Sequence, residues 1–194
     1  MRIIVFLSLV LLGLNATEPN KSQIFIGGAL GMADISKMID GQKDTPNSYK
    51  AFVWGARGGY QFSFLNGYLA IRTYLDYLMA IKPLALDTIT SSVLSLNLDL
   101  LADFLHIGEN AFGVYGGVGF GYFQHANVIK VTPEDKALVY GYTGVLNFGL
   151  GASIQSNHRV ELGIKIPFSR VKSIANPAVS YENIYASASY SYLF

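Results

Sequence analysis

The feature that most constrains this chain is an alternation of apolar and polar residues that returns in eight segments. It is clearest in residues 94–104, where every second position from Leu94 to Leu100 is leucine, while Asp99 and Asp103 fall on the other side. Successive side chains of a β-strand point to opposite faces, so a period of two predicts a strand with one apolar face. The eight segments cover residues 23–33, 51–62, 69–77, 94–104, 112–124, 140–154, 159–168 and 181–194. They predict an all-β protein.

The connections between these segments alternate in length. The long ones cover about residues 34–50, 80–91, 125–137 and 169–181, and the short ones residues 66–67, 108–111 and 156–158. Asn66 and Gly67 form a pair typical of a hairpin turn, because both residues tolerate positive φ. Tight hairpins predict an antiparallel up-and-down order, and an even number of strands brings both termini to the side of the short turns. In an outer-membrane barrel that side is periplasmic and the long loops are extracellular.

Alternation alone would also suit a soluble barrel or sandwich, so the polar face decides between the classes. Charged residues make up 14% of the chain, whereas tyrosine (13), phenylalanine (12) and glycine (20) are abundant; soluble proteins average about 25% charged residues. The polar face is rich in glycine and serine, and aromatic residues close several strands, which is typical of a barrel with lipid outside and a polar interior. We therefore expect an eight-stranded antiparallel up-and-down transmembrane β-barrel in a bacterial outer membrane, in contact with membrane lipid and lipopolysaccharide.

Eight charged residues fall on the predicted inner face, four of each sign. The basic ones are Arg57, Arg72, Arg159 and Lys165, and the acidic ones are Asp76, Asp99, Asp103 and Glu161. An eight-stranded barrel of the OmpA/OmpX type has an interior just wide enough for side chains to fill. An unpaired charge there costs several kcal/mol. We expect these residues to form a lumenal charge network, and the alternative is a polar pathway for ions.

The N-terminus predicts a cleaved signal peptide over residues 1–16. Arg2 is followed by an apolar stretch, residues 3–14, and then by Ala16 at a suitable cleavage position. A membrane anchor or a buried helix are the alternatives, but the stretch is short and polar residues follow it directly. We expect residues 17–194 to form a single outer-membrane β-barrel domain with both mature termini in the periplasm.

The C-terminal half carries a resemblance to a known family. Gly151-Ala-Ser-Ile, Asn157-His158 and Glu161-Leu-Gly-Ile-Lys-Ile-Pro167 precede a last segment with Tyr190, Tyr192 and Phe194 in one register. This stretch resembles the end of the Helicobacter-type outer-membrane protein family, which includes adhesins and porins. The resemblance implies membership and location, and the terminal aromatic residues resemble the signal read by the outer-membrane insertion machinery. The chain has no room for the large extracellular domain of the adhesins.

The sequence contains no motif for catalysis, a cofactor or a metal. It has no cysteine, which excludes thiolate sites and disulfides, and its formal charge of +1 does not favour nucleic acid. His106 and His158 fall near the short turns. His125 lies near the extracellular rim without a serine two residues on, and we interpret it as a solvated loop residue. The glycines of residues 116–121 do not form a nucleotide loop, and we interpret them as close packing across a narrow lumen.

These observations favour a monomeric structural or surface-interaction barrel that presents four extracellular loops. A small porin or transport barrel is the alternative, and a lipid-modifying outer-membrane enzyme is a third class. The loop sequences do not identify an extracellular ligand.

Overall fold

The computed structural model describes residues 22–83, 88–127, 139–172 and 178–194 of the chain. The predicted signal peptide and the first residues of the predicted mature chain lie outside the described residues. Among the described residues, no helix is long and apolar enough to cross a membrane.

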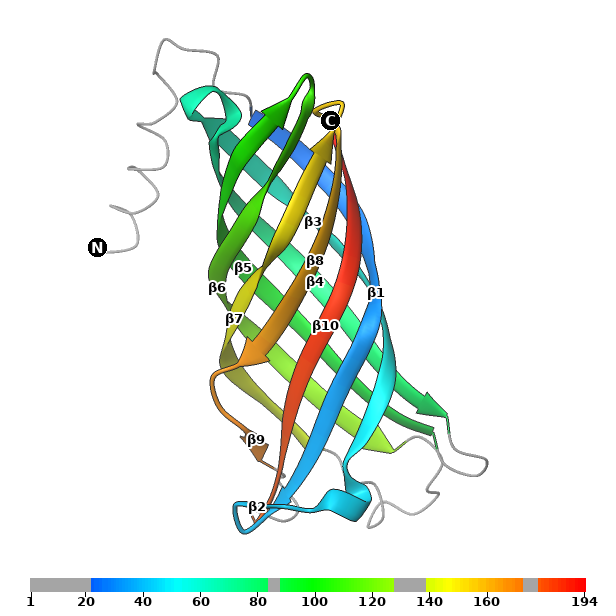
Figure 1. Cartoon of the computed structure of the whole chain (residues 1–194). Coiled ribbons are helices and arrows are strands. Elements are labelled where there is room, and N and C mark those ends of the chain that lie inside the picture. Colours follow the sequence, from blue (N-terminus) through cyan, green and yellow to red (C-terminus); the bar gives the residue numbers. More distant parts are fainter. Residues whose placement is uncertain (1–21, 84–87, 128–138, 173–177) are drawn as a thin grey trace, which may run out of the picture.

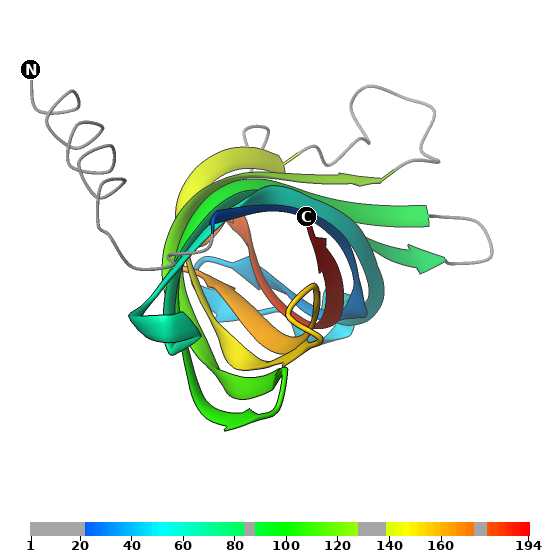
Figure 2. The same ribbon diagram turned by 90° about the horizontal axis from the view of Figure 1, so that it is seen from above.

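Eight long antiparallel strands close into a barrel, as Figures 1 and 2 show. They are β1 (Ser22–Ile39), β3 (Tyr49–Phe64), β4 (Leu69–Pro83), β5 (Thr88–Ile107), β6 (Asn110–Asn127), β7 (Val139–Ile154), β8 (His158–Pro167) and β10 (Val179–Leu193). Two short strands, β2 (Gln42–Lys43) and β9 (Val171–Lys172), extend the sheet beside β1 and β10. Each long strand pairs with the next along the chain, and β1 pairs with β10. The predicted eight-stranded up-and-down barrel is confirmed.

The strands are staggered as they go round the barrel. The stagger is measured by starting at Gly149 on β7 and moving to the paired residue on each next strand until β7 is reached again. These partners are Gly163, Ser187, Gly31, Val53, Ala80, Ser91, His125 and Val139. One circuit therefore returns to β7 ten residues from its start. A stagger of this size tilts the strands by roughly 40° from the barrel axis and fixes a narrow interior.

The short turns gather at one end of the barrel, here called the turn end, and the opposite end is called the loop end. Both termini of the barrel lie at the turn end, because Phe25 of β1 pairs with Leu193 of β10 (Figure 1). Asn66 and Gly67 have positive φ angles of 56° and 85° in the turn between β3 and β4, which confirms the predicted turn. Pro167 ends β8.

The predicted bounds of all four long connections were wrong, because strand pairing continues past the apolar part of the strands. β1 extends to Ile39 and β3 begins at Tyr49, with Asp34 opposite Lys50. β4 and β5 likewise stay paired to Pro83 and Thr88. Outside the lipid, the outward side chains no longer need to be apolar, so the alternation that marks a strand fades while the backbone ladder persists.

The apolar face of each strand points outward. The exposed large apolar residues include Ile24, Leu30, Leu75, Leu96, Val118, Phe148 and Leu162, and they come from β1, β4, β5, β6, β7 and β8. Aromatic rings border this apolar band at the turn end (Phe104, Phe112, Tyr192 and Phe194) and at the loop end (Phe52, Tyr142 and Phe168). The charged and polar residues of the alternating pattern point into the lumen.

Candidate functional site in the barrel lumen

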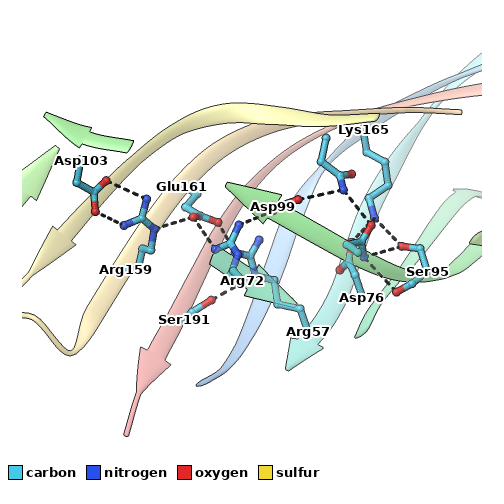
Figure 3. A network of polar contacts seen from close by, with 12 residues as sticks. Arg57, Arg72, Asp76, Ser95, Asp99, Asp103, Arg159, Glu161, Lys165 and Ser191 are labelled. Atoms are coloured by element: carbon cyan, nitrogen blue, oxygen red, sulfur yellow. Dashed lines mark hydrogen bonds and ion pairs between the residues drawn. The ribbon is translucent and has the colours of Figure 1, made fainter. Parts of the chain in front are cut away.

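All eight charged residues predicted to line the lumen are buried there. Figure 3 shows them as a continuous set of polar contacts that crosses the interior. They come from three neighbouring strands, β3, β4 and β5, and from β8 on the opposite wall of the barrel. The structure brings the four basic and four acidic groups together without an unpaired charge among these eight.

Glu161 is the centre of the network. Its carboxylate accepts hydrogen bonds from Arg72 Nη1 and from Arg159 Nε, both at 2.7 Å, and from Arg57 Nη2. Three guanidinium groups therefore share one carboxylate. Two further carboxylates balance the excess positive charge: Asp99 accepts from Arg72 Nη2 at 2.8 Å, and Asp103 accepts two bonds from Arg159, at 2.8 and 3.2 Å.

The second part of the network lies nearer the loop end. Lys165 Nζ lies 2.7 Å from Asp76 Oδ2 and donates to Ser95 Oγ at 2.6 Å and to Asn97 Oδ1 at 3.2 Å. Asn147 donates to Asn97 Oδ1 at 2.9 Å and to Asp99 Oδ1 at 3.4 Å, and so connects the lysine to the arginine cluster.

Aromatic rings and glycines shape the space around the arginines. The Arg72 guanidinium lies 4.9 Å from the Tyr74 ring centroid and 5.3 Å from that of Tyr115, within the range of cation–π attraction. Gly117 on β6 lies opposite Asp99 in the ladder, and a Cβ at Gly117 would overlap the Asp99 carboxylate. The inward glycines of β6 therefore make room for charged side chains of β5.

The loop half of the lumen is mainly apolar, which the alternating pattern did not predict. Fifteen buried residues form one cluster: Ala29, Ala33, Ile35, Tyr49, Ala51, Val53, Leu78, Ala80, Val93, Phe123, Val139, Val145, Val171, Tyr181 and Tyr185. In this part of the barrel the strands have apolar side chains on both faces, because the outer face contacts lipid and the inner face packs into this apolar cluster. Alternate positions therefore do not differ in polarity. The unbroken apolar runs, such as residues 51–54 and 77–80, could have indicated this layer, because strands buried on both faces have such runs.

A cavity of about 20 Å³ lies near Arg57, Asp76 and Lys165, which is enough for about one water molecule. Among the described residues, no group of three or more histidine, aspartate or glutamate side chains is arranged to hold a metal ion.

The interpretation of His125 as a solvated loop residue was wrong. His125 is a buried residue of β6, 5% exposed, and its ring stacks on Tyr181 with centroids 3.9 Å apart. Ser91 lies opposite it in the ladder, but this hydroxyl accepts a hydrogen bond from Asn183 at 2.7 Å. His125 Nδ1 has no hydrogen-bond partner. Continued pairing of β5 and β6 beyond the apolar band takes the histidine into the lumen, where it packs as an aromatic residue.

The residues of the predicted insertion signal lie on the outer face of β10. Tyr190, Tyr192 and Phe194 are 47%, 36% and 67% exposed. Tyr190 Oη lies 2.7 Å from His158 Nδ1, and Phe194 N donates to Ile24 O at 2.9 Å. His106 at the turn end of β5 lies against the Tyr68 ring, 4.3 Å between centroids.

The closed barrel, its outward apolar band and its polar interior define a small outer-membrane β-barrel. Residues 46–194 match the model of the Helicobacter outer membrane protein family, and the chain belongs to that family. Its place in the bacterial outer membrane follows, and the resemblance of the C-terminal segment is confirmed over a longer stretch.

Solved structures of other small barrels share the fold. Neisserial surface protein A superposes with a TM-score of 0.56 at 13% identity, covering 90% of this chain and 99% of that protein. Ail, the attachment invasion locus protein of Yersinia pestis, gives 0.52 at 13% identity, with 90% and 100% covered. A major outer membrane protein from Thermus thermophilus gives 0.52 at 14% identity, with the same coverage. No curated protein sequence matches the chain.

Proposed function

We propose that the protein is a closed barrel that acts through the surfaces at its loop end and does not conduct solutes through its lumen. One observation carries this proposal: two layers of side chains, one charged and one apolar, occupy the lumen one above the other. A solute crossing the barrel would have to displace an ion-pair network and then an apolar cluster.

Conductance of the refolded full chain in a planar lipid bilayer tests the closed lumen. The expected result is a bilayer that stays at baseline over a wide range of voltage. Steady channels of defined size would contradict it and would support the alternative of a small pore.

We further propose that the loop end faces outside the cell and the turn end faces the periplasm. The support is the general rule that such barrels have short periplasmic turns and longer extracellular loops. Both termini of the barrel lie at the turn end, so this proposal puts both mature termini in the periplasm.

The chain lacks cysteine, so single cysteines report this orientation. Lys43→Cys in exposed β2 is expected to react with a membrane-impermeant maleimide on intact cells. Glu109→Cys, in the turn between β5 and β6, is the matched control and is expected to react only after the outer membrane is permeabilised. The reverse pattern would overturn the proposed orientation.

The remaining expectations about partners are part of the same proposal. The outward apolar band is proposed to contact membrane lipid and lipopolysaccharide, and the β10 aromatics to be recognised by the insertion machinery. We propose that the barrel has no enzymatic activity, because the inward charged groups pair with one another. We also propose that it is a monomer, as expected from the sequence.

A further inference from the structure

A cluster of aromatic rings lies on the outer face of β6 and β7 at the loop end. Phe120 and Tyr142 are stacked, with centroids 5.8 Å apart and planes 5° apart. Tyr122 lies 5.1 Å from Tyr142 and 6.4 Å from Tyr140. Tyr142 is 69% exposed and Tyr140 is 42% exposed. These four rings form a continuous outward surface across two strands.

Two cationic residues, Arg170 and Lys172, belong to the segment that follows β8 and lies beside the loop end of β7. After β8 the chain continues along β7. Phe168 N donates to Gly144 O at 2.8 Å, and Ser169 N donates to Thr143 Oγ1 at 3.1 Å. The short strand β9 then lies beside the loop end of β7 (Figure 1). Val171 is buried in the lumen cluster, so its neighbours Arg170 and Lys172 point outward and are exposed. They therefore lie on the same side of the sheet as Tyr142 and Tyr140.

The ring cluster continues beyond the apolar band. Tyr140 pairs in the ladder with Gln124, where the outer face of β6 has already become polar. On β1, β3 and β10 the corresponding outward positions are Asp34, Lys50 and Glu182, without rings. Tyrosine rings at a membrane–water interface lie at the level of the lipid headgroups, so we place Tyr140, at the polar edge of the band, at that level.

We propose that Tyr140, Tyr142, Arg170 and Lys172 form a binding surface for the phosphorylated sugar headgroup of an outer-leaflet glycolipid, lipopolysaccharide. The electron-rich faces of the tyrosine rings suit the C–H faces of sugar rings, and the cations suit phosphate. Phe120 and the apolar band below continue the surface for acyl chains. Glu182 accepts a bond from Arg170 at 3.3 Å and orients it, while 43% of the arginine side chain stays exposed. This inference rests on the proposed orientation of the loop end.

Native mass spectrometry of the full chain, refolded with lipid A, tests the site by counting retained lipid A molecules. Arg170→Gln combined with Lys172→Gln is expected to weaken lipid A retention about tenfold. Each cation near an anionic lipid surface increases the affinity roughly fivefold, and the contribution of Arg170 is smaller because it also pairs with Glu182. Tyr140→Leu with Tyr142→Leu keeps apolar side chains and is expected to weaken retention as well. Lys50→Gln and Tyr77→Leu, on the other side of the barrel, are the matched controls and should leave retention unchanged.

Two further lipids separate a specific site from simple charge attraction. Dephosphorylated lipid A is expected to bind wild type and the double glutamine variant equally. Phosphatidylglycerol, which carries phosphate without sugar rings, is expected to be insensitive to the tyrosine changes. Retention that falls equally in the Lys50→Gln control, or that is unchanged in both double variants, overturns the site. If cysteine labelling confirms the orientation at the same time, only this inference fails and the proposed function stands.

Discussion

Arg72 on β4 and Glu161 on β8 meet in the middle of the lumen, with Nη1 and Oε1 2.7 Å apart. These strands are four steps apart in a barrel of eight, so the ion pair joins opposite walls. Both side chains are 1% exposed. The contact spans the barrel interior at a level where the outer face is apolar.

Glu161→Gln is expected to destabilise the barrel by about 3–5 kcal/mol, because three arginines would then share fewer negative charges in a buried site. Urea unfolding of the barrel refolded in phospholipid vesicles measures the loss. The matched control is Glu182→Gln, which removes the same charge from an exposed pair with Arg170 and is expected to cost about 1 kcal/mol or less. Equal losses in the two variants would contradict the central role of Glu161.

Gly163→Ala is expected to destabilise the barrel by about 1–3 kcal/mol, since a Cβ there would overlap the Tyr115 hydroxyl and the lumen is closely packed. The same unfolding experiment measures it. Gly116→Ala is the control, because its Cβ would meet only Asn147 O at 3.9 Å. Tyr115→Phe removes the overlapping hydroxyl and is expected to recover part of the loss; no recovery would show that the strain arises elsewhere.

Phe123→Ala opens the apolar layer and is expected to cost about 3–5 kcal/mol, because Phe123 is 2% exposed within that layer. The variant is nevertheless expected to stay non-conducting in a planar bilayer, since the charge network beneath still blocks the lumen. Stable channels in this variant would show that the apolar layer alone closes the barrel.

Phe194→Gln is expected to slow insertion into the outer membrane without abolishing refolding in detergent. The reason is that its exposed ring belongs to the proposed recognition surface rather than to the packed interior. The rate of appearance of the heat-modifiable form in cells measures this. Phe104→Gln is the control, because Phe104 is 68% exposed and Phe194 67%, both at the turn-end edge of the band. Equal delays in insertion of the two variants would mean that insertion depends on exposed apolar surface in general and not on the C-terminal residue.

The lumenal charges show how far a sequence pattern leads towards a site. Their alternation with leucines placed Asp99 and Asp103 on the inner face, and the balance of signs predicted pairing. The particular partners did not follow, because Arg72 and Glu161 are 89 residues apart and meet only through the stagger of the closed barrel. His125 was placed wrongly for a related reason: the pattern that marks a strand fades outside the lipid, although backbone pairing continues.

The sequence by itself determined the strand number, the outward face and the location in an outer membrane, because each depends on local alternation, on turn residues and on composition. Only the tertiary structure decided that the lumen has two layers and that β9 lies beside the loop end of β7. These relationships join residues from different strands. They depend on barrel closure and strand stagger, which no local pattern of residues specifies.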